Sequence, residues 1–499
     1  MSKLSGQLRG EASLRWMVIG ALLLFVGAVI NVVMDGPFSG PVMVVAVVLP
    51  FALVQLAAEV FRDRVDVRIE GLLKRQIKGL KVVTHEFPDY RFVDVFRAVE
   101  DYFAKVETTI LESHHNEPLG LIISGTFYSG SGAVKVPPHS AFQVGPTEEA
   151  FFPTERFWIR RPESEKERHL LVRLRIQEAS SVAVLEIASG QLDHAGHILS
   201  EIRDLAAAVS IYRGRAVEVS FAVGVKDEFG NVDQSGRMKV EFHKASPLKV
   251  DDIVIDDRLW PILEHSLISL HKNREQLQKY GVALKRGFLF YGPPGTGKSF
   301  TARYLATVLS DATAIYCSGT ALHHVASAFN LARLLKPAII VLEDVDLVFA
   351  SRDINPFGGA LGDLFDQIDA IGDREPICIV LTTNAIERVE AAVKDRPGRV
   401  SQCVYFGPPS ADLRRRYLRS YLGSNEMGAD DVQHVVKETD GVTQAFLKEL
   451  VHRGLQFAVE AGRISAGSLR PVAEDFDAAL AEMRAFDSKA ARAITGFRS

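Results

Sequence analysis

One short segment constrains the fold of this chain more than any other: Phe288 to Ser299 reads FLFYGPPGTGKS. It predicts an apolar strand, a loop of the form G-x-x-x-x-G-K-S and the start of a helix. Glycines let the backbone N–H groups of such a loop turn toward phosphate oxygens, and the helix N-terminus adds partial positive charge. We expect Lys298 to contact the β- and γ-phosphates of a nucleotide, and the Ser299 hydroxyl to bind Mg²⁺. The candidate phosphate-binding residues are Gly292, Pro293, Pro294, Gly295, Thr296, Gly297, Lys298, Ser299 and Phe300.

Two acidic residues follow a second apolar strand, in the sequence IIVLEDVD from Ile339 to Asp346. Glu343 and Asp344 therefore stand at the C-terminal end of a buried strand, the edge at which an open α/β sheet binds its ligands. One carboxylate is expected to hold Mg²⁺ through its water, and the next to orient and polarise an attacking water molecule.

Polar residues also end a third strand and a later turn. Asn384 closes ICIVLTTN and is expected to position the water beside the γ-phosphate, with a strand-capping asparagine as the alternative. Arg396 and Arg399 flank a Pro-Gly turn in RPGR, where guanidinium groups would stabilise charge on a γ-phosphoryl group. A charged surface turn is the alternative for these two arginines. If they act in a neighbour's site, the protein must oligomerise.

The order of predicted elements divides the chain into regions. From 248 to 410, strands alternate with helices, which is typical of an α/β domain with a parallel sheet. Helices then dominate from 411 to 486. Residues 84–247 contain strands of period two around a helix, which predicts a small α+β domain.

The 84–247 region shows no catalytic constellation. In its LLVRLRI strand, Arg173 and Arg175 alternate with apolar residues, which predicts a half-buried strand. His114 and His115 are expected to form a surface pair, because no further metal ligands follow at a suitable spacing. The formal net charge of −4 argues against a dedicated nucleic-acid-binding protein, which would carry a basic excess.

Two apolar runs near the N-terminus explain a mean hydropathy of +0.08 in a chain with 24% charged residues. Trp16 to Met34 and Pro41 to Ala58 are uncharged, and each can cross a bilayer as a helix, which takes roughly 17–25 residues. They predict a transmembrane helical hairpin, with a signal peptide and a core helix as the alternative. Flanking basic residues place both termini in the cytoplasm. We therefore expect an integral protein of a bacterial inner membrane, because no transit peptide precedes the first run.

In this order, the four motifs resemble those of the AAA ATPase family over about half of the chain. The resemblance implies a P-loop AAA core with a parallel sheet, followed by a helical lid in which Ala445 faces the nucleotide. It implies ATP and Mg²⁺ as ligands, Glu343 as the magnesium residue and Asp344 as the catalytic one. It also implies a homo-hexamer in which Arg396 and Arg399 act in the neighbouring subunit.

Three departures from the family's pattern bear on function. The usual Asp-Glu order is inverted at Glu343 and Asp344, as in the mitochondrial AAA translocase that moves a folded Rieske subunit. Ser401 replaces an aspartate, and the segment at 321–324 reads ALHH where the family carries an aromatic-apolar-glycine pore triplet. No H-E-x-x-H motif occurs, which excludes the metal site of the membrane-bound AAA proteases.

The sequence thus predicts a membrane-anchored AAA ATPase whose ring couples ATP hydrolysis to remodelling, extraction or translocation of a protein substrate or adaptor. One alternative is an ATP-gated membrane scaffold with little turnover, and another is a folded-protein translocase whose hairpins enclose a conduit. The expected organisation is an N-terminal tail at 1–15, a transmembrane hairpin at 16–61, a juxtamembrane helix at 62–83, an α+β substrate or adaptor domain at 84–247, a nucleotide-binding subdomain at 248–410, a helical lid at 411–486 and a C-terminal tail at 487–499.

Overall fold

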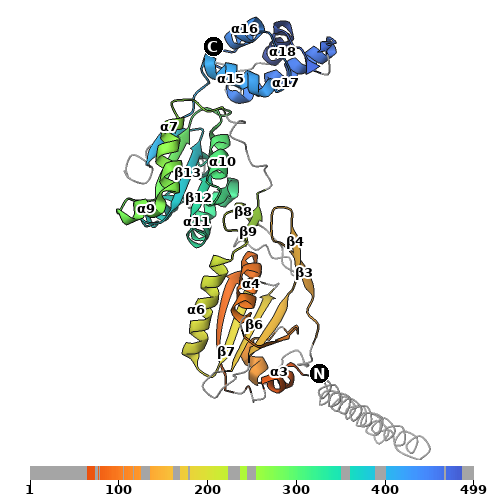
Figure 1. The fold of residues 1–499 in the computed structure, drawn as a ribbon, viewed down its shortest axis with the longest axis vertical. Coiled ribbons are helices and arrows are strands. Elements are labelled where there is room, and N and C mark those ends of the chain that lie inside the picture. Colours follow the sequence, from red (N-terminus) through yellow and green to blue (C-terminus); the bar gives the residue numbers. More distant parts are fainter. Residues whose placement is uncertain are drawn as a thin grey trace, which may run out of the picture. The chain divides into compact units, whose positions relative to one another are not determined.

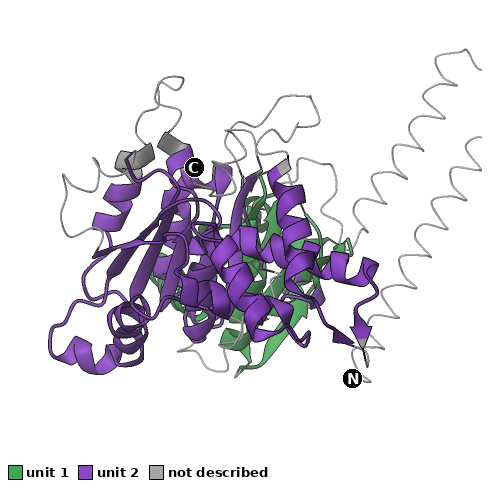
Figure 2. Cartoon of the chain, turned by 90° about the horizontal axis from the view of Figure 1, so that it is seen from above, with its two compact units in different colours: residues 1–142, 151–206 green, residues 143–150, 207–499 purple. Residues whose placement is uncertain are grey.

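The described part of the protein forms two compact units, each built on its own sheet (Figures 1 and 2). The first unit ends at residue 206, and the second continues from 207 and also includes 143–150. The computed structural model describes residues 64–73, 77, 79–104, 106–115, 117–124, 135–160, 169–177, 180–222, 237–243, 254–349, 360–387, 401–465 and 468–485.

The first unit contains a five-stranded sheet of order β1-β7-β6-β5-β2, in which every pair of neighbours is antiparallel. Its strands are β1 (Lys81–Pro88), β2 (Thr108–Leu111), β5 (Glu155–Arg160), β6 (Leu170–Gln177) and β7 (Val182–Ser189). Its helices are α3 (Val65–Leu73), η1 (Asp89–Arg91), α4 (Phe92–Phe103), α5 (Leu119–Ser124) and α6 (Leu192–Ala208). A separate hairpin is made by β3 (His139–Gln143) and β4 (Glu149–Pro153). This is an α+β arrangement.

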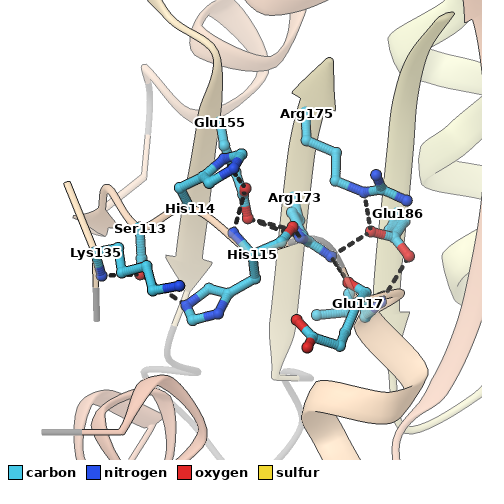
Figure 3. Close-up of polar contacts among 10 residues, drawn as sticks. Ser113, His114, His115, Glu117, Lys135, Glu155, Arg173, Arg175 and Glu186 are labelled. Atoms are coloured by element: carbon cyan, nitrogen blue, oxygen red, sulfur yellow. Dashed lines mark hydrogen bonds and ion pairs between the residues drawn. The ribbon is translucent and has the colours of Figure 1, made fainter. Parts of the chain in front are cut away.

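A buried charge network joins β5, β6 and β7 of the first unit (Figure 3). The side chain of Arg173 on β6 is wholly buried, and its guanidinium lies 2.8 Å from Glu155 and 2.9 Å from Glu186. The same guanidinium donates to the carbonyl oxygens of His115 at 2.6 Å and Glu117 at 2.7 Å. These acceptors match the fork of guanidinium donors, so the buried positive charge is both neutralised and hydrogen-bonded.

This network corrects two sequence-based expectations. Strand β6 is not half-buried, because every residue from Leu170 to Arg175 is buried. The two histidines are not a surface pair: His115 is buried, and its Nε2 lies 2.8 Å from Oγ of Ser113. Burial lowers the pKa of His115, whereas Glu155 raises the pKa of His114. The alternation of arginine and apolar residues within β6 suggests an exposed face. It does not show that the neighbouring strands supply carboxylates, which allow Arg173 to be buried.

The second unit contains a seven-stranded sheet of order β14-β10-β13-β12-β11-β8-β9, parallel from β14 to β8 and antiparallel at β9 (Figure 1). Its strands are β8 (Ala216–Ala222), β9 (Arg237–Phe242), β10 (Arg286–Tyr291), β11 (Thr313–Cys317), β12 (Ala338–Leu342), β13 (Ile377–Thr383) and β14 (Gln402–Tyr405). The helices of this part are α7 (Trp260–Leu263), the π-helix η3 (Glu264–Ser269), α8 (Leu270–Lys272), α9 (Arg274–Lys279), α10 (Lys298–Val308), η4 (Gly319–His324), α11 (Val325–Leu334), α12 (Asp346–Phe349) and α13 (Ala360–Asp369). All residues of β12 are buried, as expected for a parallel strand covered on both faces.

Strands β8 and β9 belong to this second sheet. Residues 216–219 of β8 pair in parallel with 314–317 of β11. The domain boundary expected at 247/248 therefore differs from the structural division at 206/207. A period-two pattern identifies a strand and its buried face, but it does not determine which sheet the strand joins.

A helical bundle follows the second sheet in sequence. It consists of α15 (Ala411–Leu422), α16 (Ala429–Glu438), α17 (Gln444–Glu460) and α18 (Ala473–Ala485), with the short strands β15 (Ile464–Ser465) and β16 (Ser468–Leu469). Its core includes Leu418, Val435, Leu447 and Phe476, each buried. Side-chain oxygens of Ser410 and Thr443 accept hydrogen bonds from the first turns of α15 and α17, which fixes where these two helices begin.

The structure corrects the membrane part of the expected fold. Among the described residues, no helix combines the length and the apolar composition that crossing a bilayer requires. The helices α6 and α17, with 17 residues each, carry several charged residues and bury only part of their surface. The hairpin expected at 16–61 lies outside the described residues. The integral membrane location that rested on it is therefore not retained.

Candidate functional site

The loop between β10 and α10 contains the residues expected to bind phosphate. Gly297 precedes α10 in a left-handed conformation, with φ of 97°. A side chain at this φ would be strained, and a β-carbon would lie 2.5 Å from Oε1 of Gln444, which would have to move. Thr296 Oγ1 donates to the carbonyl oxygen of Pro293 at 2.8 Å and closes the turn. The first N–H groups of α10 have no acceptor within the helix, and with the helix dipole they form an anion-binding site.

Lys298, the first residue of α10, is buried and hydrogen-bonded on three sides. Its Nζ donates to the carbonyl oxygens of Gly292 and Pro293 and to Oδ1 of Asn384, each at 2.8 Å. Burial lowers the pKa of Lys298 to about 8, although the nearby carboxylates of Asp344 and Asp346 act in the opposite direction. An anionic ligand at this ammonium would restore the stabilisation of the charge that burial removes.

Asn384 connects Lys298 to the second motif. While its Oδ1 accepts from Lys298, its Nδ2 donates to Oδ1 of Asp344 at 3.0 Å. Three residues that the sequence placed in three separate motifs are therefore joined by two hydrogen bonds. They meet because β10, β13 and β12 are parallel neighbours whose C-terminal ends share one edge of the sheet.

Glu343 offers an oxygen that suits a cation. Its Oε2 lies 3.6 Å from the guanidinium of Arg303, one turn along α10 from Ser299. Within the described part of the chain, its buried Oε1 has no hydrogen-bond partner. A buried carboxylate oxygen without a donor is costly unless a ligand engages it. Because Mg²⁺ prefers hard oxygen ligands, Glu343 and the Ser299 hydroxyl fit this ion.

A cavity of about 500 Å³ lies beside the loop. Its wall includes Ile255, Phe300 and Tyr405 from the sheet subdomain, and Tyr417 and Gln444 from the helical bundle. The volume falls within the range of small-molecule sites, roughly 300–1,000 Å³. Its position next to the phosphate loop suits the base and sugar of a nucleotide.

Residues 288–408 match the model of the family described as "ATPase family associated with various cellular activities (AAA)". The chain contains an AAA ATPase domain. The match spans the phosphate loop, both carboxylates of the second motif and Asn384.

Relatives of this AAA domain are found in archaea and fungi. The 26S proteasome regulatory subunit 8 homolog of Schizosaccharomyces pombe is 29% identical over 42% of this chain and 55% of its own length. Proteasome-activating nucleotidase 2 of Haloferax volcanii is 25% identical over 57% of this chain and 71% of its own length. A crystal structure of the FIGL-1 AAA domain in complex with ADP aligns with a TM-score of 0.40 and 20% identity, over 48% of this chain and 86% of the other. The chain thus spans about half the length of the fungal relative.

The helical bundle contacts the phosphate loop of the AAA domain through Ala445. The N–H of Ala445 donates to the carbonyl oxygen of Gly295 at 3.0 Å. A β-carbon on Gly295 would lie 2.9 Å from the methyl group of Ala445, so both residues must be small. Next to this contact, Nε2 of Gln444 donates to the Tyr421 hydroxyl at 2.9 Å. A movement of the bundle would therefore change the position of the phosphate loop directly.

Two further predictions for the AAA domain concern the arginine pair and the pore segment. Arg396 and Arg399 lie outside the described residues. The segment where the family carries its pore triplet forms the 3-10 helix η4, in which Ala321 and Leu322 are buried. The ring of His324 stacks on Phe221 at 4.2 Å.

Sequence reasoning missed three residues at the edge of the site. Thr382, Thr383 and Asp346 are all buried. Thr382 accepts from the N–H of Asp344 and Asp346 accepts from the N–H of Asn384, while the Thr383 hydroxyl donates to Asp346. The available signals were the third acid of IIVLEDVD and the paired threonines of ICIVLTTN. Neither pattern reveals the hydrogen-bond partner of these residues, because the partners lie on the neighbouring strand.

Proposed function

We propose that the AAA domain binds ATP together with Mg²⁺ and hydrolyses it. The observation that carries this proposal is the amide of Asn384, which joins the lysine expected at the phosphates to the carboxylate expected at the water. Phosphoryl transfer to water depends mainly on positioning and on electrostatic stabilisation, and this arrangement supplies both.

Nucleotide binding would use the loop, the N-terminus of α10 and Lys298. The phosphates replace the carbonyl oxygens as partners of the Lys298 ammonium, and their charge keeps it protonated. Ser299 and Glu343 would hold Mg²⁺, whose charge offsets that of the β- and γ-phosphates. The cavity beside the loop would take the nucleoside.

Hydrolysis would depend on Asp344 and Asn384. Asp344 would orient the attacking water and accept its proton as the bond from the water oxygen to the γ-phosphorus forms. The bond from the γ-phosphorus to the bridging oxygen breaks in the same step, and ADP is the leaving group. Asn384 holds one carboxylate oxygen of Asp344, which limits the directions that the other oxygen can take. Aspartate is one methylene shorter than the glutamate usual in the family, so the water must approach closer to the backbone.

For the whole protein, we propose a homo-hexameric ring that remodels a protein substrate or adaptor. In such a ring, Arg396 and Arg399 would reach the neighbouring subunit's nucleotide. The family resemblance supports this proposal, and so do relatives named as a proteasome regulatory subunit and a proteasome-activating nucleotidase. The first unit, with its separate core, would bind the substrate or adaptor.

A second candidate is a binding module that ATP controls but rarely turns over. The inverted order of Glu343 and Asp344 favours it, as does the sequence ALHH at 321–324, which lacks the family's aromatic-apolar-glycine triplet. The two candidates differ in one measurable quantity, the rate of phosphate release at saturating ATP.

Phosphate release and nucleotide binding by the purified chain test the proposal. We expect Asp344→Asn to keep ATP binding and to lower turnover by about 100-fold or more, because a general base contributes that much. Lys298→Ala should abolish nucleotide binding, because it removes the buried ammonium.

The matched control is Asp430→Asn, the same chemical change at an exposed position in the first turn of α16. It should leave both quantities unchanged. Full turnover in Asp344→Asn would refute the catalytic assignment. A wild-type chain that binds ATP and releases no phosphate would establish the binding module instead.

A further inference from the structure

The ends of β12 and β13 are joined by hydrogen bonds that the proposed mechanism does not use. Thr382 and Thr383 close β13 and are fully buried, and Asp346, just beyond β12, is 6% exposed. Within the described residues, no hydrogen bond joins any of the three to the phosphate loop. Thr382 and Asp346 bond instead to the backbone of the two residues expected to handle the attacking water, and Thr383 bonds to Asp346.

Thr382 holds the backbone of Asp344. Its Oγ1 accepts from the N–H of Asp344 at 3.0 Å, and its carbonyl oxygen accepts from the N–H of Val345 at 2.9 Å. Asp344 has φ of 52°, a left-handed conformation that is unfavourable for a residue with a β-carbon. Two hydrogen bonds from one threonine thus stabilise the backbone turn from which the Asp344 carboxylate projects.

Asp346 holds the backbone of Asn384 in return. Its Oδ1 accepts from Thr383 Oγ1 at 2.8 Å and from the N–H of Asn384 at 3.0 Å. One carboxylate oxygen therefore fixes two consecutive residues at the end of β13. The distance of 3.0 Å between Nδ2 of Asn384 and Oδ1 of Asp344 depends on both strands being held in this way.

We propose that Thr382 and Asp346 are positioning residues that set the mutual placement of Asp344 and Asn384. The two act reciprocally: the residue on β13 orients the carboxylate that follows β12, and the residue after β12 orients the amide that follows β13. This assignment rests on the proposed ATPase function. In the part of the chain that the structure describes, neither side chain hydrogen-bonds the phosphate-binding loop, so the loss of either should reduce catalysis more than nucleotide binding. Asp346 also supports the charge of Lys298 electrostatically, so the Thr382 variants isolate positioning more cleanly.

Two pairs of substitutions separate positioning from simple stability. Thr382→Val removes the acceptor for Asp344 at nearly constant volume, and Thr382→Ser restores it. Asp346→Ala removes the acceptor for Asn384, and Asp346→Asn keeps an oxygen at the same place. A displacement of about 1 Å at a reacting centre can lower the rate about 100-fold.

The matched control is Thr313→Val. Thr313 is buried at the first residue of β11, where its Oγ1 donates to the carbonyl oxygen of Leu335 at 2.9 Å and accepts from the N–H of Gly214 at 3.0 Å. It lies in the same sheet as Thr382, but at the N-terminal end of its parallel strand, away from the site edge. Its loss should lower stability without changing kcat.

The experiment measures kcat and KM for ATP, the Kd of a fluorescent ATP analogue and Tm for each variant of the full chain. We expect kcat to fall between about tenfold and about 100-fold in Thr382→Val and Asp346→Ala, with Kd little changed. Thr382→Ser and Asp346→Asn should recover most of that loss. If Asp346→Ala does not fold, the Thr382 pair decides the outcome.

Three results would overturn the assignment. Unchanged kcat in Thr382→Val, with an active wild type, would refute positioning while leaving the ATPase function intact. A loss of kcat that Thr313→Val reproduces would show a structural role only. No phosphate release from the wild-type chain would overturn the proposed function, and this assignment with it.

Discussion

Asp344 shows at the scale of one residue how the site depends on backbone conformation. Its φ of 52° is left-handed, a region that aspartate tolerates better than most residues with a β-carbon. This conformation lets the carboxylate turn toward β13, where Asn384 meets it at 3.0 Å. Strained conformations of this kind persist where surrounding contacts hold them, and they concentrate at functional sites.

Lys298 leads to a prediction about pH. Its pKa of about 8 in the free protein rises when phosphates bind, so binding takes up a proton wherever the free lysine is neutral. We expect ATP affinity to be constant well below pH 8 and to fall above it, by up to about tenfold per pH unit. Equilibrium titration with a fluorescent ATP analogue between about pH 7 and about pH 9.5 measures this effect.

Lys298→Arg is the control for this titration, because a guanidinium remains charged throughout the range. Any binding that this variant retains should not weaken with rising pH. A wild-type affinity that is flat over the whole range would show that Lys298 stays protonated in the free protein.

At the scale of elements, the strand-loop-helix unit of β10 and α10 forms the binding site, and the ends of β12 and β13 complete it. The parallel order of the sheet brings these ends to one edge. The helical bundle reaches the same edge through the start of α17, where Ala445 meets Gly295. Each of these elements is recognisable in the sequence, but their neighbours in space are not.

Two glycines inside helices lead to opposite predictions for the effect of an alanine substitution on the free energy of unfolding. A β-carbon on Gly454 of α17 would lie 2.9 Å from the ring of Phe476, whereas one on Gly196 of α6 would meet nothing within 4 Å. Gly454→Ala should lower the free energy of unfolding by about 1 kcal/mol or more, because the bundle core is overpacked. Gly196→Ala should raise it by about 0.5–1 kcal/mol, because alanine favours the helix. Chemical denaturation measures both, and equal signs would contradict the packing argument.

At the scale of the whole molecule, the chain holds two units with separate cores and separate buried networks. The first is stabilised around Arg173, whose two carboxylate partners come from neighbouring strands. The second contains the site. A perturbation in one unit should therefore be local in its effect on stability.

Hydrogen exchange with mass spectrometry tests this independence. ATP with Mg²⁺ at about 100 times its Kd should stabilise the second unit by about 2.7 kcal/mol and slow exchange in β10 and β13. Arg173→Met should destabilise the first unit by about 3–5 kcal/mol, because Glu155 and Glu186 lose their shared buried guanidinium. Among the described residues, their remaining contacts with basic side chains are longer, 3.4 Å to His114 and 3.5 Å to Arg175. The substitution should speed exchange in β6 and β7. Equal effects of either change on both units would show that they unfold as one.

The sequence predicts the central parts of the site because those parts are contiguous. The phosphate loop, Glu343, Asp344 and Asn384 each follow a short apolar strand, a pattern that can be read without knowing any neighbour. Apart from the membrane part, the corrections concern relations between segments. The strands β8 and β9 were expected with the first unit, Arg173 on a half-buried strand and His115 at the surface, and the structure differs in each case.

The sequence by itself therefore determined the phosphate-binding loop, the carboxylates that follow β12 and the alternation of strands and helices around them. Only the tertiary structure decided that Asn384 bridges Lys298 and Asp344, and that Thr382 and Asp346 hold this arrangement. The physical reason is that local conformation follows from neighbouring side chains, whereas hydrogen bonds between strands depend on their order and register. A single strand's pattern specifies its buried face and leaves both of these undetermined.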